Sequence, residues 1–213
     1  MPKLIQPKDM PRSGRLRLTS EIPEEATYQS RLDRVWHSRL DELPDDFSKH
    51  YPLKFEELDG QFEPGDMVQW CSSSARFVSA RFKALIEEVE PGVHTFIPIE
   101  ITLKDGSIRK DYSLLKIGNI LKSVVPEKSD IGALTIPNRQ TGEKMFVRYS
   151  YSIVAKLTFK RDVIGGCVLW LGHDLSASDI FCADEFIDLM IERDIHLGIQ
   201  KRGNIFFDDE VVG

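Results

Sequence analysis

Alternation of apolar and polar residues with a period of two is the feature that most constrains the fold of this chain. In residues 94–103 every second position is aliphatic from Ile97 to Leu103, which predicts a strand with one buried face. Asp105-Gly106 follows at once and predicts a type I′ hairpin turn. The return strand continues the pattern with Ile108, Tyr112 and Leu114 on one face.

A second alternating stretch covers residues 145–159. It is longer than a typical strand, so we expect a bend or a break near Ser150–Ser152. Shorter apolar runs predict further strands at 67–70, 117–125, 167–171, 180–182 and 205–207. Because strands follow one another with few helices between them, the pattern favours an α+β fold, with a largely antiparallel sheet and a few helices in a single main domain.

Helical spacing of apolar residues predicts three helices. The first covers 27–43 and ends before Pro44. The second covers about 74–89, is capped by Ser72–Ser74, and has Phe82 at the centre of its buried stripe. The remaining members of that stripe are Ala75, Val78, Leu85 and Val89.

The third helix is predicted at 184–194, where Ile187, Met190 and Ile191 should turn inward. The same spacing leaves Glu185, Asp188 and Glu192 on the exposed side. We divide the chain into residues 1–66, an N-terminal arm with a helix and an acidic connection, and residues 67–213, the main α+β domain.

The composition of the chain indicates where in the cell the protein is expected. The chain has 213 residues, of which 41% are hydrophobic and 29% charged, as expected of a soluble globular protein. No apolar run reaches the length that spans a membrane, and the N-terminal residues lack the apolar core of a secretory signal. Three cysteines, with no paired spacing, suit a reducing compartment. We therefore expect a cytoplasmic protein that does not interact with membranes.

The net charge of −6 is unevenly distributed. Residues 174–213 hold ten acidic and three basic side chains. Such a region repels nucleic acid, whose phosphates need clustered Lys and Arg. Two interpretations remain open: an ordinary solvated surface, or an acidic face that attracts a basic partner protein.

A search for reactive groups finds no catalytic, cofactor or metal pattern. The five histidines show no metal-ligand spacing, and His173-Asp174 reads as a surface pair. Gly165-Gly166 does not match a phosphate-binding loop. A nucleophile at Cys71 or Ser72–Ser74 would follow a strand and precede a helix, but serines at that place are first of all helix caps. The pattern favours binding of another macromolecule over chemistry.

Several segments together resemble a known family. Ile180–Met190 with Leu197-Gly198 forms a strand, a small residue, an acidic helix start and a closing Leu-Gly. Cys167–Leu171 resembles the family's preceding apolar strand, and Val78–Leu85 followed by Phe96–Ile99 resembles its helix-then-strand block. Over about residues 67–200 the chain is similar to the family-eleven immunity proteins of bacterial polymorphic toxin systems.

The resemblance implies a cytoplasmic antitoxin that binds a cognate toxin one-to-one, needs no cofactor and carries no catalytic residues. Two alternatives stay open, namely a hydrolase with its nucleophile near Cys71 and a self-associating structural protein. The enzyme predicts a deep pocket with a histidine beside Cys71, whereas a binder predicts a broad surface. The candidate partner-binding residues are Glu185, Asp188, Glu192, Asp208, Asp209 and Glu210.

Overall fold

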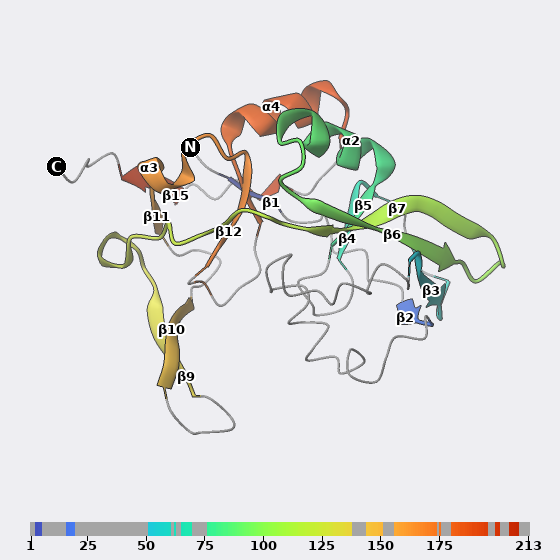
Figure 1. Cartoon of the computed structure of the whole chain (residues 1–213), viewed down its shortest axis with the longest axis horizontal. Coiled ribbons are helices and arrows are strands. Elements are labelled where there is room, and N and C mark those ends of the chain that lie inside the picture. Colours follow the sequence, from blue (N-terminus) through green and yellow to red (C-terminus); the bar gives the residue numbers. More distant parts are fainter. Residues whose placement is uncertain are drawn as a thin grey trace. The chain divides into compact units, whose positions relative to one another are not determined.

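The chain forms two compact units in the computed structural model (Figure 1). Unit 1 comprises Met1–Gln6, Asn119–Asp188 and Ile199–Gly213, and unit 2 comprises Pro7–Gly118 and Leu189–Gly198. The residues that the structure describes are 3–5, 16–19, 51–60, 62, 65–69, 76–137, 144–150, 156–173, 175, 180–195, 199–200 and 205–208. The helix predicted at 27–43 lies outside them.

Unit 2 contains a six-stranded sheet in the order β2-β3-β6-β7-β5-β4. Its neighbours run antiparallel, except for β3 and β6, which are parallel. The strands are β2 (Leu16–Leu18), β3 (Leu53–Glu57), β4 (Met67–Gln69), β5 (Arg76–Ser79), β6 (Thr95–Thr102) and β7 (Ile108–Lys116). The predicted strand at 67–70 and the predicted 94–114 hairpin are therefore present.

The turn between β6 and β7 differs from the predicted type I′. A type I′ turn needs positive φ at both central residues, and here Gly106 has φ +84° while Asp105 does not have positive φ. The Gly106 N–H donates to the Leu103 carbonyl at 2.9 Å, and the Leu103 N–H donates to the Ser107 carbonyl at 2.8 Å. The connection is thus a three-residue loop that ends on a glycine.

A β-bulge lies two residues further along β7. Ile99 pairs with Tyr112, but Ile101 pairs with Arg109, so the register shifts by one residue opposite Glu100. Because of this shift, the side chains of β7 between the turn and the bulge lie on the opposite face from the one that regular alternation predicts. Ile108, which was predicted on the buried face, is consequently 53% exposed, whereas Tyr112 and Leu114 are buried as predicted.

The predicted helix at 74–89 is wrong in its first third. Arg76–Ser79 form β5, with buried residues on both faces, and helix α2 begins only at Ala80 and ends at Val89. Its cap is Ser79, whose Oγ accepts a hydrogen bond from the Phe82 N–H at 3.2 Å. Ser72–Ser74 lie outside the described residues. Helix α2 packs against β5 and β7 and buries Phe82, Leu85 and Ile86 (Figure 1).

The opposite face of the sheet carries the apolar core of unit 2. Ile97, Ile99 and Ile101 of β6 are fully buried there, as the alternation predicts. The Phe55 and Phe77 rings meet edge-to-face with centroids 4.9 Å apart. Other members of this core are Leu16, Leu53, Val68, Tyr112 and Leu114.

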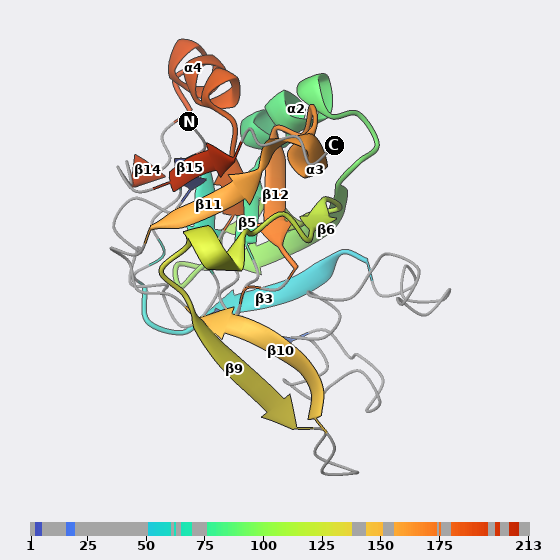
Figure 2. The same cartoon turned by 90° about the vertical axis from the view of Figure 1, so that its left-hand side faces the viewer.

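Unit 1 contains a five-stranded sheet, a parallel strand pair and a hairpin (Figure 2). The sheet order is β14-β1-β13-β12-β8, with β1 (Lys3–Ile5) between β13 and β14. Its strands β8 (Ile120–Leu121), β12 (Leu169–Gly172), β13 (Ile180–Cys182) and β14 (Ile199–Gln200) come from distant parts of the chain. The hairpin pairs β9 (Gly132–Pro137) with β10 (Lys144–Ser150), and the parallel pair joins β11 (Leu157–Lys160) to β15 (Ile205–Asp208).

These strands agree with the sequence predictions in outline. The long 145–159 alternation is divided between β10 and β11, and residues 151–155 between them are not described. The 117–125 run yields only the short β8, and the 167–171 run begins its strand at Leu169. Phe159, Trp170 and Phe181 pack together in the core of unit 1, with the Phe159 and Phe181 rings 4.9 Å apart. Unit 1 also contains the short helix α3 (Arg161–Ile164) and the 3-10 helix η3 (Pro126–Lys128).

Helix α4 (Asp184–Glu192) ends two residues earlier than predicted. Asp194 has φ +55° behind its last turn, and the Asp194 and Ile195 N–H groups donate to the carbonyls of Ile191 and Met190. This bonding stops the helix with an Asp in the place usually taken by glycine. Phe186, Ile187 and Met190 are buried, but Ile191, which was predicted to face inward, is 69% exposed.

The fold class is α+β with a mostly antiparallel sheet, as the sequence predicts. The proposed division of the chain at residue 66 stays a prediction; the six-stranded sheet takes β2 and β3 from before that position and its other strands from after it. No helix among the described residues is long and apolar enough to cross a membrane.

Candidate functional site

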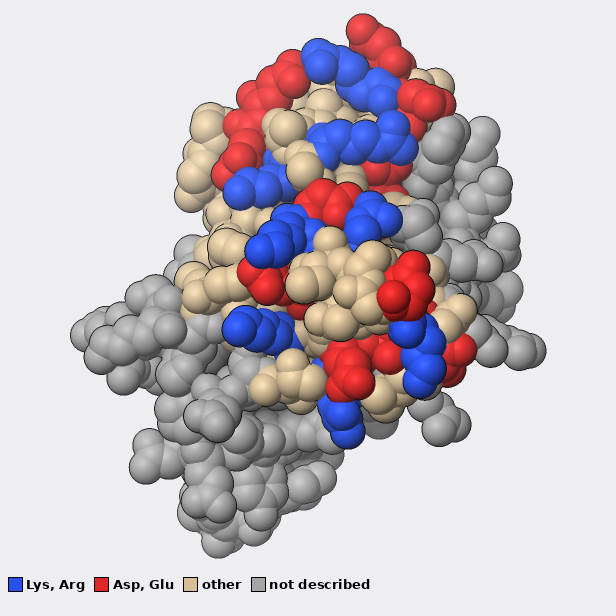
Figure 3. All heavy atoms as spheres, turned by 90° about the vertical axis from the view of Figure 1, so that its right-hand side faces the viewer, with Lys and Arg blue, Asp and Glu red and all other residues tan. Residues whose placement is uncertain are grey.

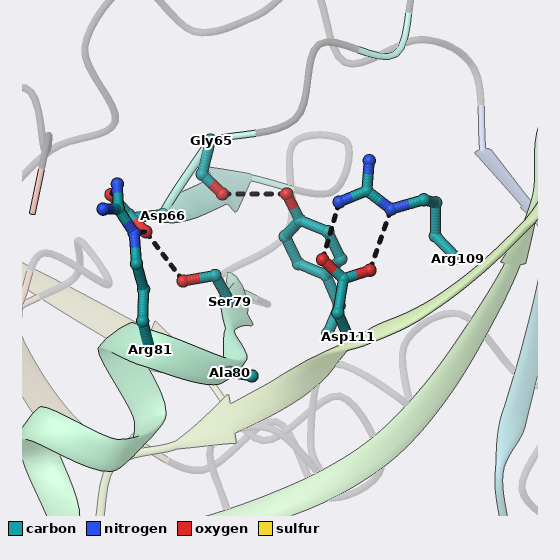
Figure 4. Close-up of a pocket in the computed structure, with 8 residues that line it drawn as sticks. Gly65, Asp66, Ser79, Ala80, Arg81, Arg109 and Asp111 are labelled. Atoms are coloured by element: carbon teal, nitrogen blue, oxygen red, sulfur yellow. Dashed lines mark hydrogen bonds and ion pairs between the residues drawn. The ribbon is translucent and has the colours of Figure 1, made fainter.

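A pocket of about 440 Å³ opens in unit 2 beside the start of helix α2 (Figure 4). Three segments meet there: the residues before β4, the junction of β5 with α2, and the middle of β7. The lining residues are Gly65, Asp66, Ser79, Ala80, Arg81, Arg109, Asp111 and Tyr112. We name this the fork pocket, after the two arginine–aspartate pairs in its wall.

The first pair joins Arg81 of α2 to Asp66. Arg81 donates from Nε and Nη2 to the two carboxylate oxygens of Asp66, at 2.6 and 2.5 Å. Ser79 Oγ donates to the same carboxylate at 2.7 Å. Asp66 is buried, so these charge-assisted hydrogen bonds offset the loss of its hydration. Because Ser79 also caps α2, the pair ties the start of the helix to the entry of β4.

The second pair joins Arg109 to Asp111 within β7. Arg109 Nε and Nη2 donate to the two oxygens of Asp111, at 2.8 and 2.6 Å. The Arg109 guanidinium lies 5.6 Å from the centre of the Tyr112 ring, in cation–π range. The Tyr112 hydroxyl in turn donates to the Gly65 carbonyl at 2.9 Å. Figure 4 shows the two pairs on either side of the pocket.

The electrostatics follow from these contacts. Burial raises the pKa of Tyr112 to about 12, so its hydroxyl stays protonated and remains a donor at neutral pH. The hydrogen bond from Arg109 lowers the pKa of Asp111, and the one to Asp66 raises the pKa of Arg81. Arg81, Arg109 and Asp111 therefore carry their charges at neutral pH.

The predicted partner-binding residues lie elsewhere. Glu185, Asp188 and Glu192 are all exposed on α4, as predicted from the helical spacing. Asp208 is the last residue of β15, while Asp209 and Glu210 lie outside the described residues. On the face shown in Figure 3, acidic and basic side chains of described residues are interspersed, with no field of a single sign.

Residues considered for catalysis give no assembled site in the described part of the chain. Cys71 and Ser72–Ser74 fall outside it, and His173 is exposed. His94 is buried, and its Nδ1 accepts the Gly118 N–H at 3.1 Å, so Nε2 carries the proton that it donates to Glu90 at 2.6 Å. Both ring nitrogens are thus engaged in holding the fold. Within the described residues, no three His, Cys, Asp or Glu side chains gather as metal ligands do.

Sequence reasoning missed the fork pocket entirely. Asp66, Arg81, Arg109 and Asp111 were not singled out, and Tyr112 was assigned only to a buried strand face. The one local signal was Arg109-x-Asp111, a pair spaced to share the face of a strand. Nothing in the sequence indicated that Asp66 would meet Arg81, because that contact depends on how β4 pairs with β5.

Similarity to a known protein family covers most of the chain. A model of the immunity protein family Imm11 matches residues 7–207, which is nearly the whole chain and extends well beyond the 67–200 region of the resemblance noted in the sequence. No curated protein sequence matches the chain. A family match of this extent includes all of unit 2 with the fork pocket and most of unit 1, and so the protein belongs to the Imm11 immunity protein family.

Proposed function

We propose that this protein binds a cognate toxin domain in the cytoplasm and neutralises it by protein–protein contact, without catalysis. The membership in an immunity protein family carries the proposal. We further propose that the toxin contacts the acidic face, defined as Glu185, Asp188 and Glu192 of helix α4. Asp208, Asp209 and Glu210 extend this proposal as a second acidic group near the end of β15.

Helix stability does not account for the charges of the acidic face. Glu185 stands in the first turn, where a carboxylate interacts favourably with the helix dipole. Glu192 stands in the last turn, where the dipole repels a negative charge, and no basic residue of that turn compensates it. Asp188 and Glu192 are also four residues apart, a spacing at which like charges repel. Two of the three charges therefore oppose the helix that carries them.

Ile191 adds an apolar group beside the acidic face. It follows Asp188 by three positions, precedes Glu192 directly, and is 69% exposed, the most exposed of the large hydrophobic residues described. An exposed apolar residue flanked by charges resembles the arrangement of apolar centre and polar rim in a protein interface. We propose that Ile191 enters an apolar depression on the toxin while the three carboxylates meet basic groups around it.

Charge reversal tests the acidic face. The variant Glu185→Lys, Asp188→Lys, Glu192→Lys should lose protection in cells that co-express the cognate toxin domain. Its association rate with that domain should fall, and the strong salt dependence of the wild-type rate should disappear. The matched control reverses three exposed acids elsewhere, Glu87→Lys, Glu127→Lys and Asp162→Lys, which changes the net charge equally and should retain protection.

A third variant tests the enzyme alternative. Cys71→Ala with Ser72→Ala should protect as well as the wild type, because the proposed mechanism uses no nucleophile. Thermal melts establish that each variant is folded. Protection by the charge-reversed protein together with death of the Cys71/Ser72 variant would refute the proposed function and favour a hydrolase.

A further inference from the structure

The fork pocket has a surplus of hydrogen-bond donors. Each guanidinium has five N–H donors and engages its aspartate through Nε and Nη2 only. The Nη1 groups of Arg81 and Arg109 have no hydrogen-bond partner among the described residues. The carboxylates of the pocket, by contrast, are engaged: Asp66 accepts three hydrogen bonds and Asp111 accepts two.

The β-bulge in β7 explains why Arg109 reaches this pocket. Ile99 and Ile101 lie on the same face of β6, and they pair with Tyr112 and Arg109 respectively. Arg109 and Tyr112 therefore share a face, although their spacing of three would place them on opposite faces of a regular strand. Lys110 is directed to the other face, where its Nζ pairs with Glu100 at 3.2 Å. The bulge thus selects which of two adjacent cations enters the pocket.

The surroundings of the free donors favour a carboxylate. Ala80 and Arg81 are the first residues of α2, so the positive end of the helix dipole adjoins the pocket. The Tyr112 ring lies against the Arg109 guanidinium and helps to hold it in position beside the pocket. The side chains of Arg81 and Arg109 remain 53% and 33% exposed although each is already paired, so each can accept a second carboxylate on its open edge.

We propose that the fork pocket is a socket for an acidic side chain, Asp or Glu, presented by the toxin. This inference rests on the proposed function and adds a second contact of opposite polarity to the acidic face. The incoming carboxylate binds the Nη1 edges of Arg81 and Arg109. Arg109 also keeps its bond to Asp111, and Arg81 keeps its bonds to Asp66, so no ion pair of the free protein has to break.

Substitution of Arg109 tests the socket, with its neighbour as the control. Arg109→Gln should weaken binding of the toxin domain by roughly tenfold or more, mainly through faster dissociation, because a buried interfacial charge pair is lost. Arg109→Lys keeps the positive charge but loses the planar guanidinium. Its dissociation constant for the toxin domain should lie between those of the wild type and Arg109→Gln. Lys110→Gln removes the same charge from the next residue, on the opposite face, and should change the dissociation constant by less than about twofold.

The measurements are dissociation constants and rates by surface plasmon resonance, with melting temperatures as a folding check. Arg side-chain NMR follows the Nε–Hε signals of Arg81 and Arg109 with toxin, glutarate or inorganic phosphate added. Toxin should shift both signals. If toxin leaves them unchanged while glutarate or phosphate shifts them, the pocket takes small anions and the proposal is overturned.

The outcomes separate the socket from the proposed function. Equal binding by the Arg109→Gln and Lys110→Gln proteins overturns the socket, while wild-type binding and loss of binding in the acidic-face variant leave the proposed function intact. Absence of any binding by the wild type overturns the proposed function itself.

Discussion

Truncation of Phe82 is the sharpest test of how unit 2 is held together. Phe82 is 1% exposed in the first turn of α2, between the helix and strands β5 and β7. Phe82→Ala removes roughly 100 Å² of buried apolar surface, worth about 2.5 kcal/mol at ~25 cal/mol per Å². A residual cavity of about 60 Å³ adds about 1.5 kcal/mol. We expect a total loss of about 4 kcal/mol, within the range of about 3–5 kcal/mol that such substitutions show.

Urea denaturation followed by circular dichroism measures this loss. The control is Glu87→Ala, an exposed position of the same helix, which should change the free energy of unfolding by no more than about 0.5 kcal/mol. A loss below about 1 kcal/mol for Phe82→Ala would refute the packing of α2 on the sheet. A large loss in both variants would mean that α2 depends on its own helix-forming tendency rather than on burial.

Three further predictions concern the backbone and pH. Asp194→Gly should raise the free energy of unfolding by about 0.5–1 kcal/mol, since glycine adopts φ +55° without strain, whereas Asp194→Ala should not stabilise. Gly118→Ala should cost about 2–3 kcal/mol, because its Cβ would lie 1.9 Å from the Val93 carbonyl oxygen; Gly166→Ala, with open space around it, should be nearly neutral. The folded-state pKa of Tyr112, about 12, is above its ordinary 10.0, so its contribution to stability is complete below pH 10 and is lost as the pH rises toward 12. Denaturation at pH 9 and pH 11 should therefore show the wild type losing about 1 kcal/mol more than Tyr112→Phe.

The strands were predictable wherever one face of the sheet meets an apolar core and the other does not. Such strands show the period of two, as 94–103 does, and the hairpin followed from Asp105-Gly106. Strand β5 was not predictable in this way, because Arg76, Phe77 and Val78 are all buried and no alternation remains. The spacing of Val78, Phe82 and Leu85 fits a helix, although Val78 lies in β5, and the predicted start of the helix was therefore too early.

The misplaced side chains have two physical causes. Ile108 was assigned to the wrong face because a period of two holds only in a regular strand, and the bulge inserts one residue. Ile191 was assigned inward because it is apolar, although Phe186, Ile187 and Met190 already fill the buried side of α4.

Exposure of the acidic face was predictable, since it depends only on the helical period of α4. The fork pocket was not, because it brings together residues from three separate segments. Its hydrogen bonds depend on strand pairing and on the bulge, neither of which leaves a clear mark in a single sequence. The sequence thus predicted the exposed acidic residues of α4, but it did not predict the two arginine–aspartate pairs of the fork pocket.

The position of β1 has a consequence for synthesis on the ribosome. Lys3–Ile5 pair with Ile180–Cys182 on one side, and Leu4 and Ile5 pair with Gln200 and Ile199 on the other, so this strand finds its partners only after residues 180–200 have been synthesised. At bacterial and eukaryotic elongation speeds of about 5–20 residues per second, the strand waits roughly 10–40 s. Unit 2, which is encoded almost entirely between β1 and these partners, can fold first while unit 1 remains open. The fork pocket, whose lining residues all belong to unit 2, can therefore form before β1 has paired in the sheet of unit 1.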